Sequence, residues 1–232
     1  MAAQETAFII GVGPGLSASL ARLFAKEGMD VALGARNVEK LDTLAKETNA
    51  ARFPIDVVDP DSVNRFFADA VADKGAPGIV VYNPSARTRG PFVEQDAEAV
   101  KNALMISCYG GFLVGQAAAK LMLEQGSGSI QFTGASASVK GYPQSASFAM
   151  GKFGLRGLVQ SMARELAPKN IHVAHFVIDG GISKGPDDPR ATRGEDGLLE
   201  PDAIAESYLY VHRQHRSAWT WEVELRPWVE SF

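Results

Sequence analysis

A glycine-rich turn near the N-terminus is the feature that most limits the folds open to this chain. The apolar run Ala7–Ile10 leads into Gly-Val-Gly-Pro-Gly at 11–15, and apolar residues then recur at helical spacing from Leu16 to Gly28. This order predicts a strand, a tight turn and a helix. Glycines there let bare backbone approach a phosphate, and the helix start offers N–H groups and a positive dipole. The sequence therefore predicts a pyrophosphate site formed by Gly11, Gly13, Gly15 and Leu16.

Apolar runs and helical segments alternate along the rest of the chain. The runs are apolar throughout, as in parallel strands that helices cover on both faces. We therefore predict an α/β fold with one Rossmann-like, doubly wound parallel sheet flanked by helices, in a single NAD(P)-binding domain over residues 1–232. The expected strands are 7–10, 31–35, 52–55, 78–82, 129–133, 171–178 and a half-exposed strand at 219–225, and the longer helices are 62–71, 98–123 and 147–166.

Residues 179–201 interrupt this alternation with glycines, prolines and charges. Such a composition predicts a mobile loop between the sixth strand and a late helix. A lid over a ligand is the functional interpretation of this loop, and simple disorder is the alternative.

The composition excludes several classes of function. The chain has 232 residues, 46% of them hydrophobic and 22% charged, so it can bury a sizeable core without disulfides. A net charge of -4 and the lack of a Lys/Arg cluster argue against nucleic acid as a partner. Cys108 is the only cysteine, no secretory signal is visible, and no run approaches the ~18 apolar residues of a membrane span. We expect a cytoplasmic protein that does not enter the membrane.

The turn and several later landmarks resemble the short-chain dehydrogenase/reductase family over nearly the whole length. The glycine spacing is close to the family's G-x-x-x-G-x-G, with Gly11 and Gly15 present and Ser17 where the final glycine would be. Lys152 falls at the family's catalytic lysine. The resemblance implies further nucleotide contacts at Asp56, Val57, Asn83 and Ile182, the last in a turn where Asp179 replaces the usual proline.

By the same resemblance, the protein acts on a small-molecule substrate. The resemblance also implies a homodimer or homotetramer that assembles through the helices at 98–123 and 147–166.

The end of the second strand bears on the choice of nucleotide. An NAD-specific enzyme usually places a carboxylate there to accept hydrogen bonds from the ribose hydroxyls. This chain has Ala35 at that place, followed by Arg36. A guanidinium suits a 2′-phosphate, so we predict NADP(H) in preference to NAD(H), with Arg36 as a solvated charge before a helix as the alternative.

The reactive centre departs from the family. Its Tyr-x-x-x-Lys pair becomes Phe148 to Lys152, and a phenyl ring has no exchangeable proton. The serine position falls on Ala135 and the asparagine position on Ser107. Lys152 can still hold the nicotinamide ribose hydroxyls, so cofactor binding can outlast the usual acid catalysis.

A substitute proton donor is needed if catalysis persists. Tyr142 is the first candidate because it carries a phenol, and Ser136, beside Ala135, is the second; the other nearby hydroxyls are Thr133, Ser145 and Ser147. Protonation by water, or hydride transfer to a carbon–carbon or carbon–nitrogen double bond, would also relieve the demand for a tyrosine.

Two functions therefore stand side by side. The first is an NADP(H)-dependent oxidoreductase with a non-standard active site, and the second is a non-catalytic NADP(H)-binding protein, such as a sensor or partner subunit. Arg87 and Arg89, which follow the fourth strand, could meet an acidic substrate, although a solvated loop explains them equally well. The histidines lack the cysteine or carboxylate support that a metal site needs, so no metal is expected.

Overall fold

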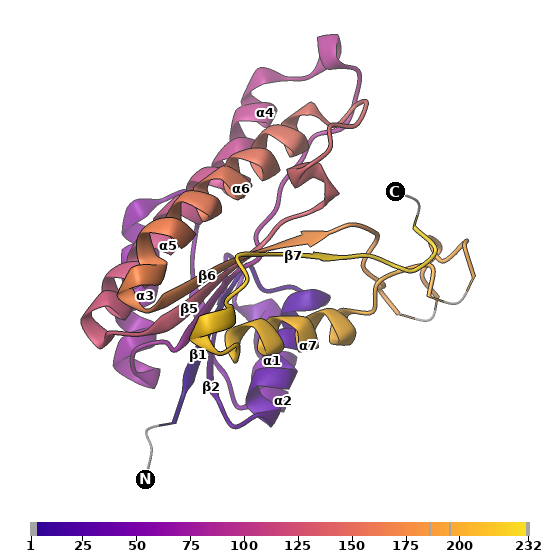
Figure 1. The fold of residues 1–232 in the computed structure, drawn as a ribbon. Coiled ribbons are helices and arrows are strands. Elements are labelled where there is room, and N and C mark those ends of the chain that lie inside the picture. Colours follow the sequence, from indigo (N-terminus) through magenta and orange to yellow (C-terminus); the bar gives the residue numbers. More distant parts are fainter. Residues whose placement is uncertain (1–3, 186, 195, 231–232) are drawn as a thin grey trace.

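The computed structural model describes residues 4–185, 187–194 and 196–230. One parallel sheet of seven strands runs through the molecule in the order β3-β2-β1-β4-β5-β6-β7, with helices on both faces (Figure 1). The chain thus starts in the middle of the sheet, builds outward to β3, and crosses back to β4 on the other side of β1. This arrangement confirms the predicted Rossmann-like fold.

The elements follow the predicted alternation closely. The strands are β1 Thr6–Ile10, β2 Asp30–Ala35, β3 Ala51–Pro54, β4 Ile79–Tyr82, β5 Gly128–Thr133, β6 Ile171–Ile178 and β7 Glu222–Leu225. The α-helices are α1 Leu16–Lys26, α2 Asp42–Thr48, α3 Pro60–Lys74, α4 Ala97–Leu104, α5 Gly110–Gln125, α6 Ala146–Leu166 and α7 Pro201–His212.

Each central strand sends alternate side chains to opposite faces of the sheet, which is the period of a strand. In β1, Ala7 and Ile9 join the core beneath α1, α2 and α7. Phe8 and Ile10 join the core beneath α3, α5 and α6. All four side chains are fully buried, and this explains why β1 is apolar at every position.

The long helix predicted at 98–123 contains a local irregularity. Between α4 and α5 the backbone forms one π-helical segment, Met105–Tyr109. Its Ile106 carbonyl accepts a hydrogen bond from the buried Tyr82 hydroxyl. Helical periodicity cannot reveal such a segment, and π-segments occur often at functional sites.

The predicted last strand is shorter than expected. Residues 219–221 lie outside β7: Trp219 stacks on the His172 ring at 4.6 Å, and the Trp221 carbonyl accepts a hydrogen bond from the His175 N–H at 2.8 Å. The loop at 179–201 contains local structure in its described part. Ile182 forms a bridge with Leu199, and Arg190 pairs with the buried Asp188 at 2.6 Å.

The helical stretch Ala97–Gln125 is long and apolar enough to span a membrane, with 29 residues and a mean hydropathy of 1.2. It is the one such helix in the described residues. A core helix passes the same test, and Val114, Ala118 and Met122 of α5 pack against the sheet. The hydropathy of this stretch is therefore weak evidence for a membrane span.

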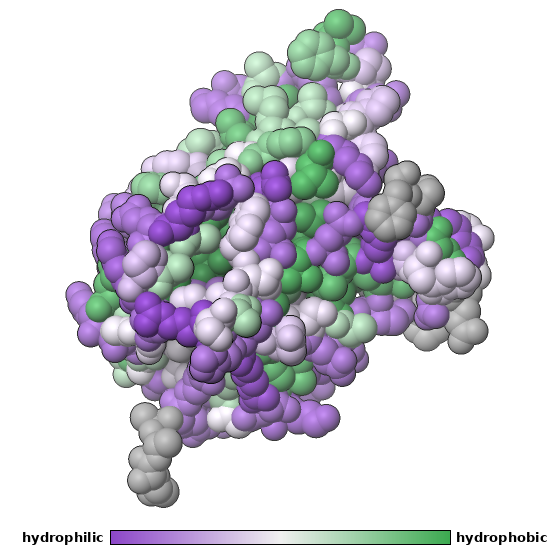
Figure 2. All heavy atoms as spheres, in the orientation of Figure 1, coloured by the Kyte–Doolittle hydropathy of each residue, from purple (hydrophilic) through white to green (hydrophobic). Residues whose placement is uncertain are grey.

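Large apolar side chains are exposed on the two helices that were expected to form a subunit interface. They are Tyr109 at the end of the π-helical segment, Phe112 and Leu123 of α5, and Met150 and Phe153 of α6. Figure 2 also shows apolar surface at the tip of the molecule beyond α4, where Phe92 and Val93 are 80% and 89% exposed. An oligomer through these helices remains a prediction.

Candidate nucleotide and active site

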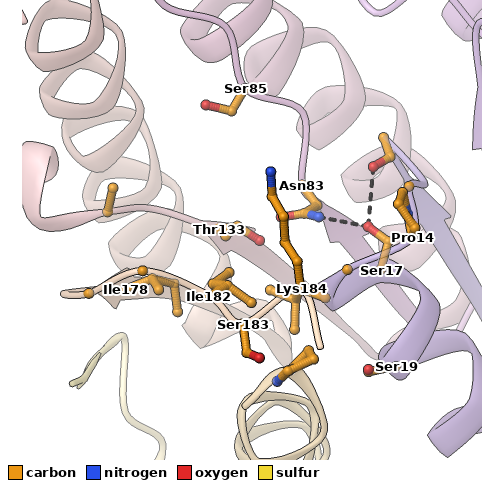
Figure 3. A pocket seen from close by; sticks show the side chains of 18 of the residues that line it. Pro14, Ser17, Ser19, Asn83, Ser85, Thr133, Ile178, Ile182, Ser183 and Lys184 are labelled. Atoms are coloured by element: carbon orange, nitrogen blue, oxygen red, sulfur yellow. Dashed lines mark hydrogen bonds between the residues drawn. The ribbon is translucent and has the colours of Figure 1, made fainter. Parts of the chain in front are cut away.

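A cavity of about 1070 Å³ opens at the carboxyl ends of the central strands. Parallel α/β sheets bind ligands at this edge, where the strand order reverses. Figure 3 shows the contributing segments converging from β1, β4, β5 and β6. The lining residues come from 11–17 in the first turn, Ser19 and Arg22 of α1, 83–89 after β4, 133–136 at the end of β5, Phe148 and Lys152 of α6, 178–185 at the end of β6, Arg190, and Glu200, Pro201 and Asp202 at the start of α7.

Gly11 has a structural reason to be glycine. Its φ is +82°, and an added Cβ would lie 2.6 Å from the backbone nitrogen of Pro84. Its N–H donates to the Gly34 carbonyl at 2.9 Å. Gly11 therefore lets the turn leave β1 between β2 and β4.

At Gly13 and Gly15 the fold itself does not require glycine. Neither has a positive φ, and an added Cβ would meet nothing within 4 Å at either position. No side chain caps α1, whose first residue Leu16 also lines the cavity. Small residues that face open space beside an uncapped helix start fit a ligand that approaches the backbone closely. A pyrophosphate group meets that description.

Asn83 and Ser17 fasten the turn to the end of β4. The Asn83 side-chain amide donates to the Ser17 hydroxyl at 2.6 Å, and that hydroxyl donates to the Gly11 carbonyl at 3.1 Å (Figure 3). Ser17 is the residue at the family's last glycine position, and sequence reasoning assigned it no role. Its side chain is 1% exposed, so it stabilises the glycine turn at 11–15 from the protein interior.

A second cavity of about 560 Å³ continues from the first and shares Gly13, Pro14 and Arg22 with it. Its lining includes Arg36 and Lys40. Sequence reasoning singled out Arg36 but missed Lys40, because a lysine four residues further along a polar segment carries no distinctive signal. The two cations make this end of the site favourable for a phosphate.

Asp56 and Val57 lie elsewhere. Neither residue lines either cavity within the described part of the chain. Val57 is buried, and the Asp56 carboxylate accepts a hydrogen bond from the Val58 N–H at 3.2 Å. Their contact with an adenine remains a prediction.

Lys152 reaches the cavity from α6 and is 2% exposed. Its Nζ donates to the Thr133 carbonyl oxygen at 2.7 Å. Burial lowers the pKa of this ammonium from 10.5 to about 8. The group is therefore held at the end of β5 with two N–H donors left for other partners.

The reactive end of the cavity contains Phe148, Ala135, Ser136 and Thr133. The Ser136 hydroxyl has no hydrogen-bond partner among the described residues. Thr133 shares its hydroxyl with Tyr208 at 2.8 Å. Tyr142, in contrast, is 44% exposed and does not line this cavity in the described structure.

The remaining hydroxyls near α6 turn away from the cavity. Ser147 is fully buried and bonds Thr88. Ser107 is also fully buried and bonds Ala86. Neither serine lines the cavity.

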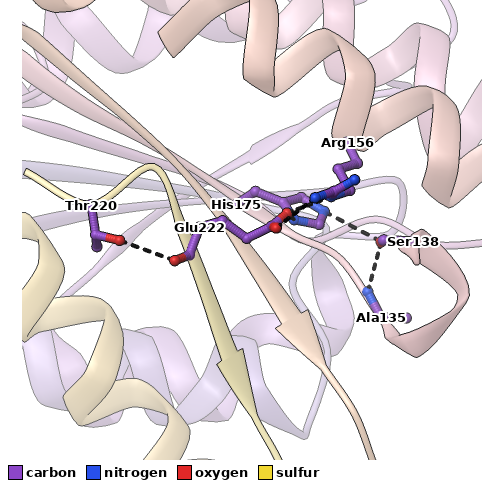
Figure 4. A network of polar contacts seen from close by, with 6 residues as sticks. All are labelled: Ala135, Ser138, Arg156, His175, Thr220 and Glu222. Atoms are coloured by element: carbon purple, nitrogen blue, oxygen red, sulfur yellow. Dashed lines mark hydrogen bonds and ion pairs between the residues drawn. The ribbon is translucent and has the colours of Figure 1, made fainter. Parts of the chain in front are cut away.

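A buried polar network supports the loop that carries Ala135 and Ser136 (Figure 4). The Ser138 hydroxyl accepts from the Ala135 N–H at 3.1 Å and lies 3.3 Å from His175 Nε2. His175 Nδ1 lies 3.0 Å from Glu222, which Arg156 binds through two hydrogen bonds of 2.6 and 2.8 Å. Burial lowers the pKa of His175 from 6.5 to about 4. A neutral ring therefore accepts from Ser138 and donates to Glu222.

The turn after β6 places Ile182 in the cavity, together with Gly180 and Gly181. Asp179, at the usual proline position, is 5% exposed. Its carboxylate receives Lys140 at 3.2 Å and Arg226 at 3.1 Å. These two ionic contacts hold the turn that follows β6.

Among residues 4–185, 187–194 and 196–230, no group of three histidine, cysteine or carboxylate side chains is placed to hold an ion.

Comparison with known proteins agrees with this geometry. The family model for short chain dehydrogenases matches residues 5–183. A short-chain dehydrogenase from Rhodopseudomonas palustris superposes with a TM-score of 0.83 at 38% identity, covering 97% of this chain and 99% of that one. The 3-oxoacyl-acyl-carrier-protein reductase FabG of Thermotoga maritima is 27% identical, with 94% of each chain covered.

A fourth comparison concerns the fold alone. An alcohol dehydrogenase from the archaeon Thermococcus sibiricus, complexed with 5-hydroxy-NADP, has a TM-score of 0.86 at 23% identity over 98% of both chains. The family match, the sheet order and the glycine turn lead to one conclusion: this chain belongs to the short-chain dehydrogenase family.

Proposed function

We propose that this protein is an NADP(H)-dependent oxidoreductase that acts on a small molecule, with a carbonyl or alcohol as the reacting group. The observation that supports this most is the continuous path of two cavities along the glycine turn. One end of that path carries Arg36, and the other ends at Lys152 and Phe148. A long ligand with a pyrophosphate in the middle and a further phosphate at one end, such as NADP(H), matches both the length of the path and its charges.

Each part of the path has a separate task. The N–H groups around Gly13 and Gly15 bind the pyrophosphate, and Arg36 with Lys40 binds the 2′-phosphate. Lys152 binds ribose hydroxyls, while Ile182 contributes backbone groups to the amide of the nicotinamide. NADP(H), when bound, supplies or accepts the hydride. The side chains of the protein must then orient the substrate and donate a proton to its oxygen, or remove one from it.

The proton is the difficult step, because Phe148 cannot exchange one. Ser136 is the better placed of the two predicted donors, since it lines the cavity and its hydroxyl is unpaired in the described structure. It can hydrogen-bond the substrate oxygen, with solvent as the final proton source. Tyr142 would have to move into the cavity from its exposed position.

The rival proposal is a non-catalytic NADP(H)-binding protein. The replacement of the phenol by Phe148 favours it, because the nucleotide contacts do not depend on that phenol. Fold alone does not distinguish a catalyst from a sensor.

A two-stage experiment tests the proposal. NADPH and NADH are first titrated into the purified protein while nucleotide fluorescence is followed, and we expect tighter binding of NADPH. Carbonyl, enone and imine panels are then screened for NADPH oxidation at 340 nm. Binding without turnover across every panel would favour the sensor. No binding of either nucleotide would overturn both proposals.

Two matched variants identify the proton donor once turnover is found. Ser136→Ala should lower kcat and leave the Kd for NADPH unchanged, whereas Tyr142→Phe should change neither. The opposite pattern would return the role to Tyr142.

A further inference from the structure

Arg87 lies over the ring that replaces the family's tyrosine. Its guanidinium carbon is 5.3 Å from the centroid of the Phe148 ring, and both residues line the larger cavity together with Arg89. A guanidinium at this distance from an aromatic face is attracted by the ring's quadrupole. Partial burial, together with the nearby charge of Arg89, lowers the pKa of Arg87 from its ordinary value.

The backbone on either side of Arg87 is clamped by two buried serines. The Ser107 hydroxyl accepts from the Ala86 N–H and donates to the Ala86 carbonyl, both at 3.2 Å. The Ser147 hydroxyl accepts from the Thr88 N–H at 3.0 Å and donates to the Thr88 carbonyl at 3.1 Å. These contacts fix the residues before and after Arg87.

The two serines lie where the reactive centre has changed. Ser107 occupies the position at which the family resemblance places an asparagine, and Ser147 precedes Phe148 in α6. Both side chains are fully buried. Through these hydrogen bonds they hold the segment that carries Arg87. Arg87 and Arg89 themselves are exposed to solvent at the cavity.

No carboxylate neutralises this pair of cations in the described structure. The other two arginines that line the cavity are paired, Arg22 with Glu47 at 2.7 Å and Arg190 with Asp188 at 2.6 Å. Arg87 and Arg89 have no ion pair within the described residues. Two neighbouring unpaired guanidiniums repel each other, and a bound anion would relieve that repulsion.

We propose that Arg87 and Arg89 bind a carboxylate of the substrate, and that the apolar body of the substrate rests against Phe148. The substrate class is therefore a small oxo acid or the corresponding hydroxy acid. This inference rests on the proposed function for its reaction, but the anion site consists of this chain's own residues. A planar guanidinium matches a carboxylate with two parallel hydrogen bonds.

The test compares carboxylates with their neutral esters. Benzoylformate and acetoacetate, each against its methyl ester, are titrated into the NADPH-loaded protein by calorimetry and assayed for NADPH oxidation. We expect the acids to bind at least tenfold more tightly than the esters. Arg87→Ala should raise the Kd or KM of the acids about tenfold or more, leave the esters within about twofold, and leave the Kd for NADPH unchanged. Arg87→Lys should recover part of the loss.

Arg164→Ala, on the exposed face of α6, is the matched control and should change none of these values. Acids that bind no better than esters would overturn the inference, as would an Arg87→Ala variant that weakens acids and esters equally. The titrations are repeated without nucleotide, so a failure of NADPH to bind counts against the proposed function alone. Preference for acids in that experiment would still support the anion site.

Discussion

The two ends of the large cavity differ in the kind of group on which they depend. The nucleotide end relies mainly on backbone: Gly13 and Gly15, which face open space, and the uncapped start of α1. The reactive end relies on side chains, and there Phe148, Ala135 and Ser107 replace the groups that the family resemblance leads us to expect. Backbone geometry is kept when most side chains are substituted. A proton donor, in contrast, is lost when a tyrosine hydroxyl oxygen is removed, as in a phenylalanine. Nucleotide binding and acid catalysis can therefore change independently within one fold.

The largest predicted effect comes from filling the nucleotide end. Gly13→Val should weaken NADPH binding about 1,000-fold, or by ~4 kcal/mol, because the added side chain takes the space in which a pyrophosphate would lie. The fold should survive, since an added Cβ meets nothing within 4 Å. Fluorescence titration measures the binding, and thermal unfolding measures the stability.

Gly157→Val is the control for that variant. Gly157 lies in α6, and its added Cβ also meets no neighbour, but it does not line the cavity. It should leave the Kd for NADPH unchanged. A Gly13→Val protein that still binds NADPH at the wild-type level would show that the glycine turn is not the cradle.

Most of the residues predicted at the nucleotide end line the two cavities, whereas Tyr142, the first predicted proton donor, does not, and the reason is physical. A glycine turn between an apolar strand and an amphipathic helix is a local pattern, so neighbouring residues reveal it. The clamp of Ala86 by Ser107 joins segments 21 residues apart, and the clamp of Thr88 by Ser147 joins segments 59 apart. No local pattern reports such contacts.

Because local sequence patterns do not report contacts between distant segments, the sequence also could not show which residues line the cavities. The position of Tyr142 depends on how the loop between β5 and α6 folds, which its Gly-Tyr-Pro sequence does not fix. Lys40 and Ser17 were missed because one looks like an ordinary helix lysine and the other like an imperfect glycine motif. Their importance becomes visible only when the cavity walls are assembled.

The second prediction restores the missing group at the reactive end. Phe148→Tyr adds a phenol to a ring that already faces the cavity beside Lys152. If proton transfer limits the reaction, kcat should rise about 100-fold, because a positioned general acid contributes at least that much. The Kd for NADPH should stay within about twofold. Steady-state kinetics with the best substrate from the panel measures both effects.

Phe153→Tyr makes the same chemical change on an exposed part of α6 and should not alter kcat. An unchanged kcat for Phe148→Tyr would mean that a different group, such as Ser136, already meets the need for a proton. The reactive end would then differ from the family in its residues but would still be able to protonate the substrate.

The third prediction concerns the choice of nucleotide. Arg36→Ala should weaken NADPH about 30-fold and NADH less than twofold, because it removes a charge-assisted contact that only the 2′-phosphate can make. The two Kd values come from the same fluorescence titration. Arg65→Ala, on the exposed side of α3, should affect neither nucleotide. Equal weakening of NADPH and NADH by Arg36→Ala would contradict the NADP(H) assignment.

The smallest predicted effect tests how the reactive end is supported. The His175 ring is buried, and that burial lowers its pKa from 6.5 to about 4. The unfolded chain therefore takes up the proton first as the pH falls. The stability that the neutral ring contributes is complete above pH 6.5 and is lost progressively toward pH 4. Between pH 7 and 5.5 the loss should be about 1 kcal/mol, or a Tm shift of ~2–4 °C.

Denaturant unfolding at several pH values isolates this contribution. His175→Gln cannot take up a proton, so the variant should lose less stability than the wild type between pH 7 and 5.5, even if it is less stable at pH 7. His215→Gln, at an exposed site, should keep the wild-type slope. Equal slopes for the wild type and His175→Gln would contradict the prediction, because they would mean that His175 takes up its proton alike in the folded and unfolded chain. A reduced slope would show that the buried His175 beneath the Ala135 loop is the source of this pH dependence.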